Sequence, residues 1–437
     1  ALPISLGTPK LLVLGLQHMF AMFGATVLVP ALTGLSVSAT LLFAGLGTLF
    51  FHFVTKGKVP AFLGSSFAYL AGYAAIAPNG EAALLPYACV GVAASGLLYL
   101  ILAALVRGFG ANRVMRFFPP VVTGPIIICI GMTLANSAIN NCTGSWDIAL
   151  VAILTVVIFN IWGKGMLRII PILLGVLVSY VYAAVTGRVD FSGVASAAWI
   201  GLPVKMENTV FSLIGNCDAN LLVTAIIAIM PIAFATMIEH IGDICAISST
   251  VGANFIADPG LHRTLLGDGL ATSIASLFGA PANTTYGENT GVLALTRVYD
   301  PLVIRLAAVY AIIASFCPKF AALVSAMPTG TIGGVSLILY GMISAIGVRN
   351  LVENRVDLAK SRNVIVVSLI ISLALGITFS TAGAITFHVG EFTLNFSGLA
   401  VAAIVGIVVN AILPGKDYNF QNDYEYGKTT EDHGQML

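Results

Sequence analysis

Charged residues are scarce in this 437-residue chain. Asp, Glu, Lys and Arg together make up 9% of it, whereas a typical soluble domain carries about 25%. Hydrophobic residues make up 58%, so there are too few polar side chains to cover a surface that faces water. This composition excludes a soluble globular protein and indicates one that crosses a membrane many times. The net charge of +1 also argues against a nucleic-acid partner.

Cysteine is rare as well, and the six cysteines are scattered. No CxxC pair and no Cys/His ligand spacing occurs, so we expect neither a structural metal nor another cofactor. Cys142 and Cys217 both fall in loops expected on the outer side of the membrane, and a disulfide between them stays open at this point. The other four are expected to pack as small apolar side chains.

Long apolar runs are what the chain has in abundance. A membrane-spanning helix needs about 20 mostly apolar residues, and the first run is long enough to stay as a span rather than be removed as a signal peptide. The fold class predicted is therefore an all-α polytopic membrane protein. We expect fourteen spans, near residues 11–33, 38–55, 59–77, 83–107, 117–138, 146–163, 167–187, 220–250, 262–279, 281–297, 302–326, 329–348, 363–382 and 398–414.

The positions of the positive charges test this count. If the N-terminus is cytoplasmic, 17 of the 20 Lys and Arg residues lie inside, and only Arg188, Lys205 and Lys319 lie outside. This distribution follows the positive-inside rule, and one span more or fewer before Lys56 would scramble it. We therefore expect both termini in the cytoplasm.

Two stretches interrupt the apolar pattern in the same way: VPAFLGSSFAYL from Val59 and APANTTYGENTG from Ala280. Each has a proline, then two hydroxyl residues, an aromatic residue and a small residue. They fall in the third and tenth expected spans, which are equivalent positions if a unit of seven spans is repeated. Because seven is an odd number, the second unit would be inverted in the membrane relative to the first. Paired, interrupted segments of this kind indicate the substrate site of a transporter.

We expect each stretch to form a short strand followed by a half-helix, beginning near Phe67 in one copy and near Tyr286 in the other. Irregular backbone at membrane depth is tolerated where it lines a cavity. The free N–H groups and the positive dipole end of each half-helix would then point toward the bilayer centre. The alternative is two chance turns between helices.

Four acidic residues lie in the interior of expected spans, away from their ends. Glu239 and Asp243 are one helical turn apart in the eighth span, Asp268 lies in the ninth, and Glu288 lies in the first turn of the second half-helix. A carboxylate in mid-membrane costs roughly 2.5–3.5 kcal/mol on insertion scales, so such residues generally serve a function. A structural role as a cap or an interface acid stays open for Asp243, Asp268 and Glu288.

These groups favour a particular kind of ligand. Carboxylates accept hydrogen bonds and free backbone N–H groups donate them, so a matching ligand has N–H donors beside C=O acceptors on a small rigid frame, as a nucleobase does. Phe67 and Tyr286 offer aromatic faces for stacking. A simple anion fits less well because Glu239 and Glu288 would repel it, and a bare cation would leave the amides unused.

At these residues the sequence resembles a known family. The stretch ENTGVLALTR from Glu288 is similar to the signature of the nucleobase–ascorbate transporters, also called nucleobase–cation symporter-2. QHMFAMFGATVLVP, KVPAFLGSSFAY and DPGLHRTLLGDGLAT are similarly typical, so the resemblance covers nearly the whole chain. Within the family, NTTYGEN and GSSFA are most similar to the bacterial uracil permeases.

The resemblance implies a seven-plus-seven inverted repeat, in which a core domain moves like an elevator against a gate domain, in a homodimer in the bacterial plasma membrane. The core would comprise residues 1–110 (spans 1–4), 220–300 (spans 8–10) and 301–326 (span 11). The gate would comprise residues 111–190 (spans 5–7) and 327–415 (spans 12–14). Residues 191–219 would be an extracytoplasmic loop and 416–437 a cytoplasmic tail.

The resemblance also implies roles for residues. Glu239 and Glu288 would hold a pyrimidine ring, main-chain groups of Phe67, Tyr286 and Gly287 would add contacts, and Ala25 would lie alongside. Besides the substrate, membrane lipid is the partner expected.

Two positions depart from the uracil permeases. Asp243 stands where they usually carry a histidine that is associated with proton coupling. Asp268 stands where they carry an asparagine, and the same position is acidic in xanthine and urate transporters. Glu288 is the uracil-like choice. We therefore predict uracil import by proton symport, with Glu239, Asp243 and Asp268 as the coupling acids. A xanthine or other purine symporter and sodium-coupled nucleobase uptake are the alternatives.

Other classes of protein fit less well. The sequence EHIGD at Glu239 is not the HExxH zinc motif, and no Ser/His pair lies on plausible neighbouring helices, so we expect no enzyme. An ion channel would be expected to have a pore-lining ring or subunit symmetry rather than an internal inverted repeat.

Overall fold

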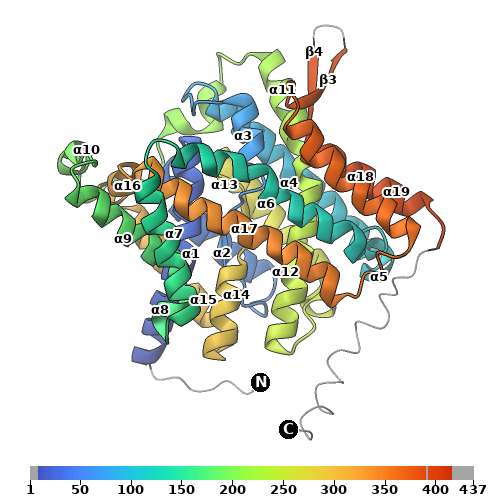
Figure 1. Ribbon diagram of the computed structural model, residues 1–437, viewed down its shortest axis with the longest axis horizontal. Helices are drawn as coiled ribbons and strands as arrows, with labels where there is room; N and C mark the ends of the chain where they lie inside the picture. The colour runs from blue at the N-terminus through green and yellow to red at the C-terminus, as the bar shows by residue number, and fades with distance from the viewer. Residues whose placement is uncertain (1–7, 390–391, 416–437) are drawn as a thin grey trace, which may run out of the picture.

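The computed structural model describes residues 8–389 and 392–415 and is mostly helical (Figure 1). The longer helices are α1 (Thr8–Thr33), α2 (Val37–Val54), α4 (Leu85–Phe109), α6 (Pro120–Cys142), α7 (Trp146–Trp162), α9 (Pro171–Val185), α11 (Ala219–Ile229), α12 (Ala233–Val251), α13 (Leu261–Leu277), α14 (Gly287–Thr296), α15 (Pro301–Ser315), α17 (Thr329–Glu353), α18 (Ser361–Thr378) and α19 (Gly398–Ile412).

Short elements connect these helices. The short helices are α3 (Leu70–Ile76), α5 (Ala111–Met115), α8 (Met166–Ile169), α10 (Ser192–Ser196), α16 (Pro318–Ser325), the 3-10 turns η1 (Met206–Asn208), η2 (Val210–Leu213) and η3 (Met230–Ile232), and the π-helical turn η4 (Ile256–Gly260). The strands are β1 (Leu63–Ser65), β2 (Asn283–Thr285), β3 (Ala384–Val389) and β4 (Phe392–Ser397).

Seven helical runs in residues 8–389 and 392–415 are long and apolar enough to cross a membrane, or eight if α15 and α16, which meet at 88°, form one bent span. The seven are α1, α2, α4, α6, the run from α11 to α12, α17 and α18. Each overlaps a run that the sequence predicts as a span. The helices α7, α9 and α19 are apolar but shorter.

Three helix pairs form much of the framework: α6 packs along α17, α4 along α13, and α2 along α15. The first pair runs side by side across the front of Figure 1. Small residues let membrane helices approach closely. A Cβ atom on Gly131 of α6 would lie 2.2 Å from the main-chain oxygen of Tyr340, and one on Gly96 of α4 would lie 1.9 Å from Oγ of Ser273. Glycine therefore sets the separation of these pairs.

Three features differ from the sequence prediction. α3 begins at Leu70 rather than near Phe67, because a turn comes first in which the Leu70 N–H bonds to the Phe67 oxygen. The expected eighth span is interrupted at η3, where Pro231 has no N–H to continue the helical ladder. β3 and β4 form an antiparallel hairpin between α18 and α19, at the top of Figure 1, and the expectation of fourteen apolar runs contained no such element.

The cysteine pair left open by the sequence is not joined, since Cys142 and Cys217 are both free. Cys142 is buried at the end of α6, with its sulfur against Gly333 of α17, whereas Cys217 is exposed in the segment before α11. The two cysteines therefore lie in different surroundings.

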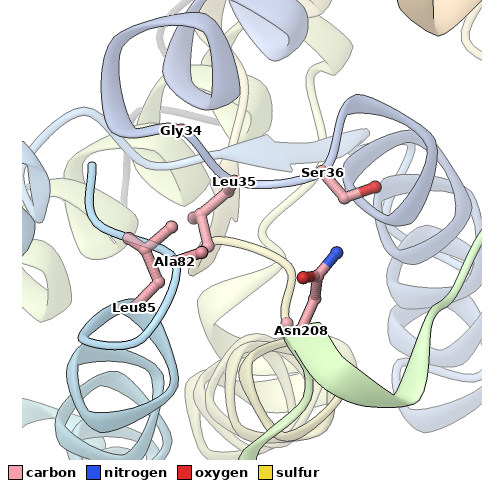
Figure 2. A pocket seen from close by; sticks show the side chains of 7 residues that line it. Gly34, Leu35, Ser36, Ala82, Leu85 and Asn208 are labelled. Carbon is pink, nitrogen blue, oxygen red and sulfur yellow. The ribbon is translucent and has the colours of Figure 1, made fainter.

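A small cavity of about 30 Å³ lies where four connecting segments meet (Figure 2). The amide of Asn208 points toward Ser36, whose own hydroxyl accepts from the Ala39 N–H at 3.2 Å. Its size suits one water molecule. The turn after α1, the loop before α4, η1 and the turn after α13 therefore lie on one side of the molecule. The lining residues are Gly34, Leu35, Ser36, Ala82, Leu85, Asn208 and Gly279.

Candidate functional site

Two strands from distant parts of the chain meet in the interior, where every residue of 59–69 and 279–286 is buried. β1 pairs antiparallel with β2, with Gly64 opposite Thr284 at the centre. Ser66 N–H also donates to the Ala282 oxygen at 2.8 Å, which extends the ladder. An antiparallel pair has local two-fold symmetry. Two inverted copies of one segment would meet in this way.

The first residue of each strand is held by a threonine from the helix before it. Thr48 of α2 accepts a hydrogen bond from the Leu63 N–H at 2.9 Å, and its own hydroxyl lies 3.2 Å from the Leu63 oxygen. Thr272 of α13 accepts from the Asn283 N–H at 3.2 Å and donates to the Asn283 oxygen at 2.9 Å. The same contact therefore fixes both strands to the helical framework.

The side chain of Tyr286 belongs to this scaffold. Its hydroxyl accepts from Thr26 at 3.3 Å and donates to the Ser65 oxygen at 3.0 Å. A Cβ atom on Gly64 would lie 2.4 Å from Cζ of Tyr286, so only glycine leaves room for the ring. The N–H of Tyr286 is bonded to the Phe62 oxygen. With 4% exposure, Tyr286 does not offer the stacking face that the sequence suggested.

The start of α14 presents free hydrogen-bond donors. The helix follows β2 directly, and the side chain of its N-cap residue, Tyr286, makes no capping hydrogen bond. The N–H of Gly287 has no hydrogen-bond partner among the described residues. Gly287 is exposed, and no atom lies within 4 Å of the position that its Cβ would take. Open space therefore lies beside Gly287, at a helix end that carries partial positive charge, with the half-buried Glu288 next to it.

α12 brings two more carboxylates to the same place. Asp243 accepts a hydrogen bond from Thr285 at 2.7 Å, which ties α12 to the end of β2. Glu239 is half-buried one turn earlier, and its Oε2 is buried without a hydrogen-bond partner. Glu239 interacts electrostatically with Glu288. Glu239, Asp243 and Glu288 form the acidic cluster. None of the ion pairs in the described part of the chain involves it.

Asp268 has a different environment from the acidic cluster. It is fully buried on α13, and its Oδ2 lies 3.2 Å from Nδ1 of His240. The approach is within ion-pair distance but is not aligned as a hydrogen bond. The sequence places His240 beside Glu239 in the eighth span but assigns it no role, because a histidine next to a candidate acid carries no signal of its own.

Phe67 contacts a helix that the sequence did not connect to the site. Its ring meets that of Tyr340 on α17 edge-on, with centroids 5.8 Å apart. Both side chains are buried. A single tyrosine within an apolar helix is common, so no sequence signal marked Tyr340.

α1 supports the second strand and the helix that follows it. Ala25 is fully buried next to Thr26, which holds the Tyr286 hydroxyl. Further along α1, the His18 oxygen accepts a hydrogen bond from Nδ2 of Asn289 at 3.1 Å. The beginning of α14 is therefore fixed from behind, which keeps Gly287 and Glu288 in place.

The site combines carboxylate acceptors with main-chain donors in a mostly buried setting. Such a set can hold a small ring that has both N–H and C=O groups. Among the described residues, no group of three or more His, Cys, Asp or Glu side chains is arranged to hold a metal ion.

Full-length relatives of this chain are permeases. It is 43% identical to the uracil permease of Bacillus caldolyticus over 423 residues, which cover 94% of each protein. It is 40% identical to the uracil permease of Bacillus subtilis (strain 168), over 96% of this chain and 94% of that protein. Identity to the uracil permease of Escherichia coli (strain K12) is 38%, over 91% and 90%.

Solved structures share the fold at low sequence identity. The transmembrane domain of a cyanobacterium bicarbonate transporter, BicA, matches with a TM-score of 0.62 at 13% identity, over 92% of this chain and 96% of that one. The murine anion transporter Slc26a9 in the inward-facing state matches with a TM-score of 0.63 at 11% identity, over 94% and 68%. These likenesses concern the fold alone.

A protein-family model described as the permease family (Xan_ur_permease) matches residues 9–383. Together with the full-length relatives, this match identifies the chain as an integral membrane transporter rather than an enzyme. It belongs to the permease family of the nucleobase–ascorbate transporters.

Proposed function

We propose that the protein imports uracil together with a proton as a secondary active transporter. One observation carries the proposal: the acidic cluster meets the uncapped N-terminus of α14 at the paired strands. Carboxylates can accept from the two N–H groups of uracil, and main-chain N–H groups can donate to its carbonyl oxygens. The uracil permeases among the relatives support this choice of substrate.

The bound ring would lie in the open space before Gly287. Glu239 and Glu288 would accept from its N–H groups, and the Gly287 N–H would donate to a carbonyl oxygen. Main-chain groups at Phe67 would complete the contacts, because the turn before α3 interrupts regular hydrogen bonding there. Ala25 and Tyr286 would lie behind the uracil ring, where the Tyr286 hydroxyl holds β1 in place.

Transport would follow from fourteen segments in a seven-plus-seven inverted repeat, with an elevator-like movement of the core domain against the gate domain. The antiparallel strand pair and the two threonine contacts support such a repeat. The packing of α2 along α15 and α4 along α13 lies within the proposed core, and that of α6 along α17 lies within the proposed gate. We also propose a homodimer in the bacterial plasma membrane with both termini in the cytoplasm.

Glu239 is the proposed proton carrier, with Asp243 and Asp268 adjusting its charge. A buried carboxyl group disfavours its charged form, and neighbouring acids add to this effect. Proton and substrate would then travel together because each stabilises the binding of the other. Sodium coupling is the second candidate, since Asp243 and Thr285 place oxygen atoms 2.7 Å apart at the site.

Two measurements test this function. Thermal unfolding of the detergent-solubilised protein with uracil, thymine, xanthine or hypoxanthine should show the largest stabilisation with uracil. A preference for xanthine would identify a purine transporter instead.

Uptake of labelled uracil into proteoliposomes should follow an imposed pH gradient and persist when choline replaces sodium. Glu239→Gln should abolish uphill accumulation, and full accumulation with an unchanged pH dependence would exclude Glu239 as the proton carrier.

A further inference from the structure

We propose that His240 and Asp268 form a pair that shares one proton. The pair leaves Asp268 without an unbalanced negative charge, and it holds α12 so that Glu239 faces the acidic cluster. This inference rests on the proposed function only for the role of Glu239. The two side chains are fully buried on neighbouring helices, with Nδ1 of His240 3.2 Å from Oδ2 of Asp268.

The two side chains compensate each other's burial. Neither ring nitrogen of His240 and neither carboxyl oxygen of Asp268 makes an aligned hydrogen bond to a described residue. Buried charges are costly unless they are paired. The 3.2 Å approach between the two groups therefore provides the compensation that their surroundings lack.

The groups around the pair are aromatic or acidic. The His240 ring meets Phe51 of α2 at 6.3 Å and Tyr99 of α4 at 6.5 Å, both edge-on. Asp268 acts electrostatically on Tyr99 and Tyr69, and also on Glu239 and Asp243. No Lys or Arg among the described residues acts on Glu239 or Asp243. His240 is the basic side chain within ion-pair distance of Asp268 and can balance its charge.

The position of His240 links this balance to the substrate site. Consecutive residues of a helix point about 100° apart, so His240 fastens α12 to α13 while Glu239 faces the acidic cluster. A pair that shares one proton has no net charge, whether as imidazolium with carboxylate or as imidazole with carboxylic acid. Glu239 then exchanges its proton beside a neutral neighbour instead of a second negative charge. His240 and Asp268 are therefore positioning residues.

The full-length wild type, His240→Gln, Asp268→Asn and the double variant test the pair. We would first measure the thermal unfolding midpoint between pH 5 and pH 9. His240→Gln should lower the midpoint more as the pH rises, because Asp268 then ionises without a partner. Asp268→Asn should lower it more as the pH falls, because His240 then becomes charged without a partner. The double variant, with two amides that can hydrogen-bond, should recover most of the midpoint.

A matched control comes from His52 on α2. It is also buried, but its Nε2 meets the Ala61 oxygen at 2.9 Å instead of an acid. His52→Gln should change the midpoint by the same amount from pH 7 to pH 9, where a buried imidazole without an acid is neutral in both the folded and the unfolded chain. A His240→Gln effect that is equally constant above pH 7, or an Asp268→Asn effect that does not grow as the pH falls, would overturn the proposal, because the pair would then act through packing alone.

Uracil uptake as a function of pH is the second measurement. In His240→Gln, the pH of half-maximal uptake should move up by about one unit, because an unpaired Asp268 charge makes Glu239 keep its proton. The double variant should return it to near the wild-type value. A folded, stable double variant with no uptake would refute the proposal, since Asp268 itself would then carry the proton. If the wild type takes up no uracil, the proposed function fails, and the unfolding midpoints still decide whether the pair exists.

Discussion

The two stretches that cross at the site, residues 59–76 and 281–296, use the same frame for different chemistry. Each has a three-residue strand whose first residue is bound by a threonine of the preceding helix. After β1, a turn of uncharged residues comes before α3. After β2, α14 begins at once and carries Glu288 in its first turn. The first stretch therefore supplies uncharged side chains, and the second supplies a carboxyl group and a free main-chain donor.

The aromatic residues after the two strands differ by one hydroxyl oxygen, and this difference directs their rings to different partners. Tyr286 has a hydroxyl, which turns its ring back over β1 to reach Thr26 and Ser65. Phe67 has none, and its ring packs against Tyr340 of α17 instead. Two strands held in the same way thus carry different chemistry, as the proposed binding of an asymmetric ring would require.

The largest effect should come from removing the charge of the second copy. Glu288→Gln keeps the shape of the side chain but replaces a carboxylate acceptor with a neutral amide. A hydrogen bond to a charged group contributes about 1.5–3 kcal/mol, so uracil should bind about 10- to 100-fold more weakly. Equilibrium binding of labelled uracil to the purified protein measures this change.

The first copy provides the matched control for that experiment. Ser66→Ala removes a buried hydroxyl that has no hydrogen-bond partner among the described residues, so uracil affinity should stay near that of the wild type. Equal losses in the two variants would mean that both copies contribute polar contacts, against the division of roles inferred here.

A smaller effect should follow when the contact between the copies is broken. In Gly64→Ala, the new methyl group would start 2.4 Å from the Tyr286 ring and force it out of place. Overpacking of this kind costs about 1–3 kcal/mol, so the thermal unfolding midpoint should fall and uracil binding should weaken with it.

Gly291 of α14 is the control glycine, because no atom lies within 4 Å of its expected Cβ position. Gly291→Ala should raise stability by up to about 1 kcal/mol, since alanine favours the helix. If Gly64→Ala were as stable as Gly291→Ala, the position of the Tyr286 ring would not depend on the absence of a side chain at Gly64.

The sequence could predict those parts of the site that depend on local pattern. Polar, proline-containing interruptions located both crossing stretches, and the cost of charge in a membrane singled out Glu239, Asp243, Asp268 and Glu288. It could not predict what depends on the approach of distant segments. The contact of His240 with Asp268, the reach of Tyr340 to Phe67 and the seat of Tyr286 over Gly64 each join residues from different helices or strands.

The late start of α3 and the β3–β4 hairpin were missed for a related reason. Single turns and short hairpins are decided by a few hydrogen bonds, such as that from Leu70 to Phe67, which apolar periodicity does not report. The ring of Tyr286 was assigned to stacking because an aromatic residue at a site suggests it, whereas the hydroxyl directs the ring elsewhere.

Effects no larger than that of Gly64→Ala should come from the two threonine contacts, and they test most directly whether the two strands are held in the same way. Thr48→Val and Thr272→Val keep side-chain shape but leave the Leu63 and Asn283 N–H groups without their acceptors. An unsatisfied buried donor costs about 1–3 kcal/mol, so each variant should unfold at a lower temperature by a similar amount. Thr250→Val is the control, since the Thr250 hydroxyl bonds within its own helix. Because both contacts hold one strand pair, the double variant should lose less than the sum of the two. Additive losses would instead mean that β1 and β2 are fixed independently, so that the two contacts are alike in geometry but not coupled in their contribution to stability.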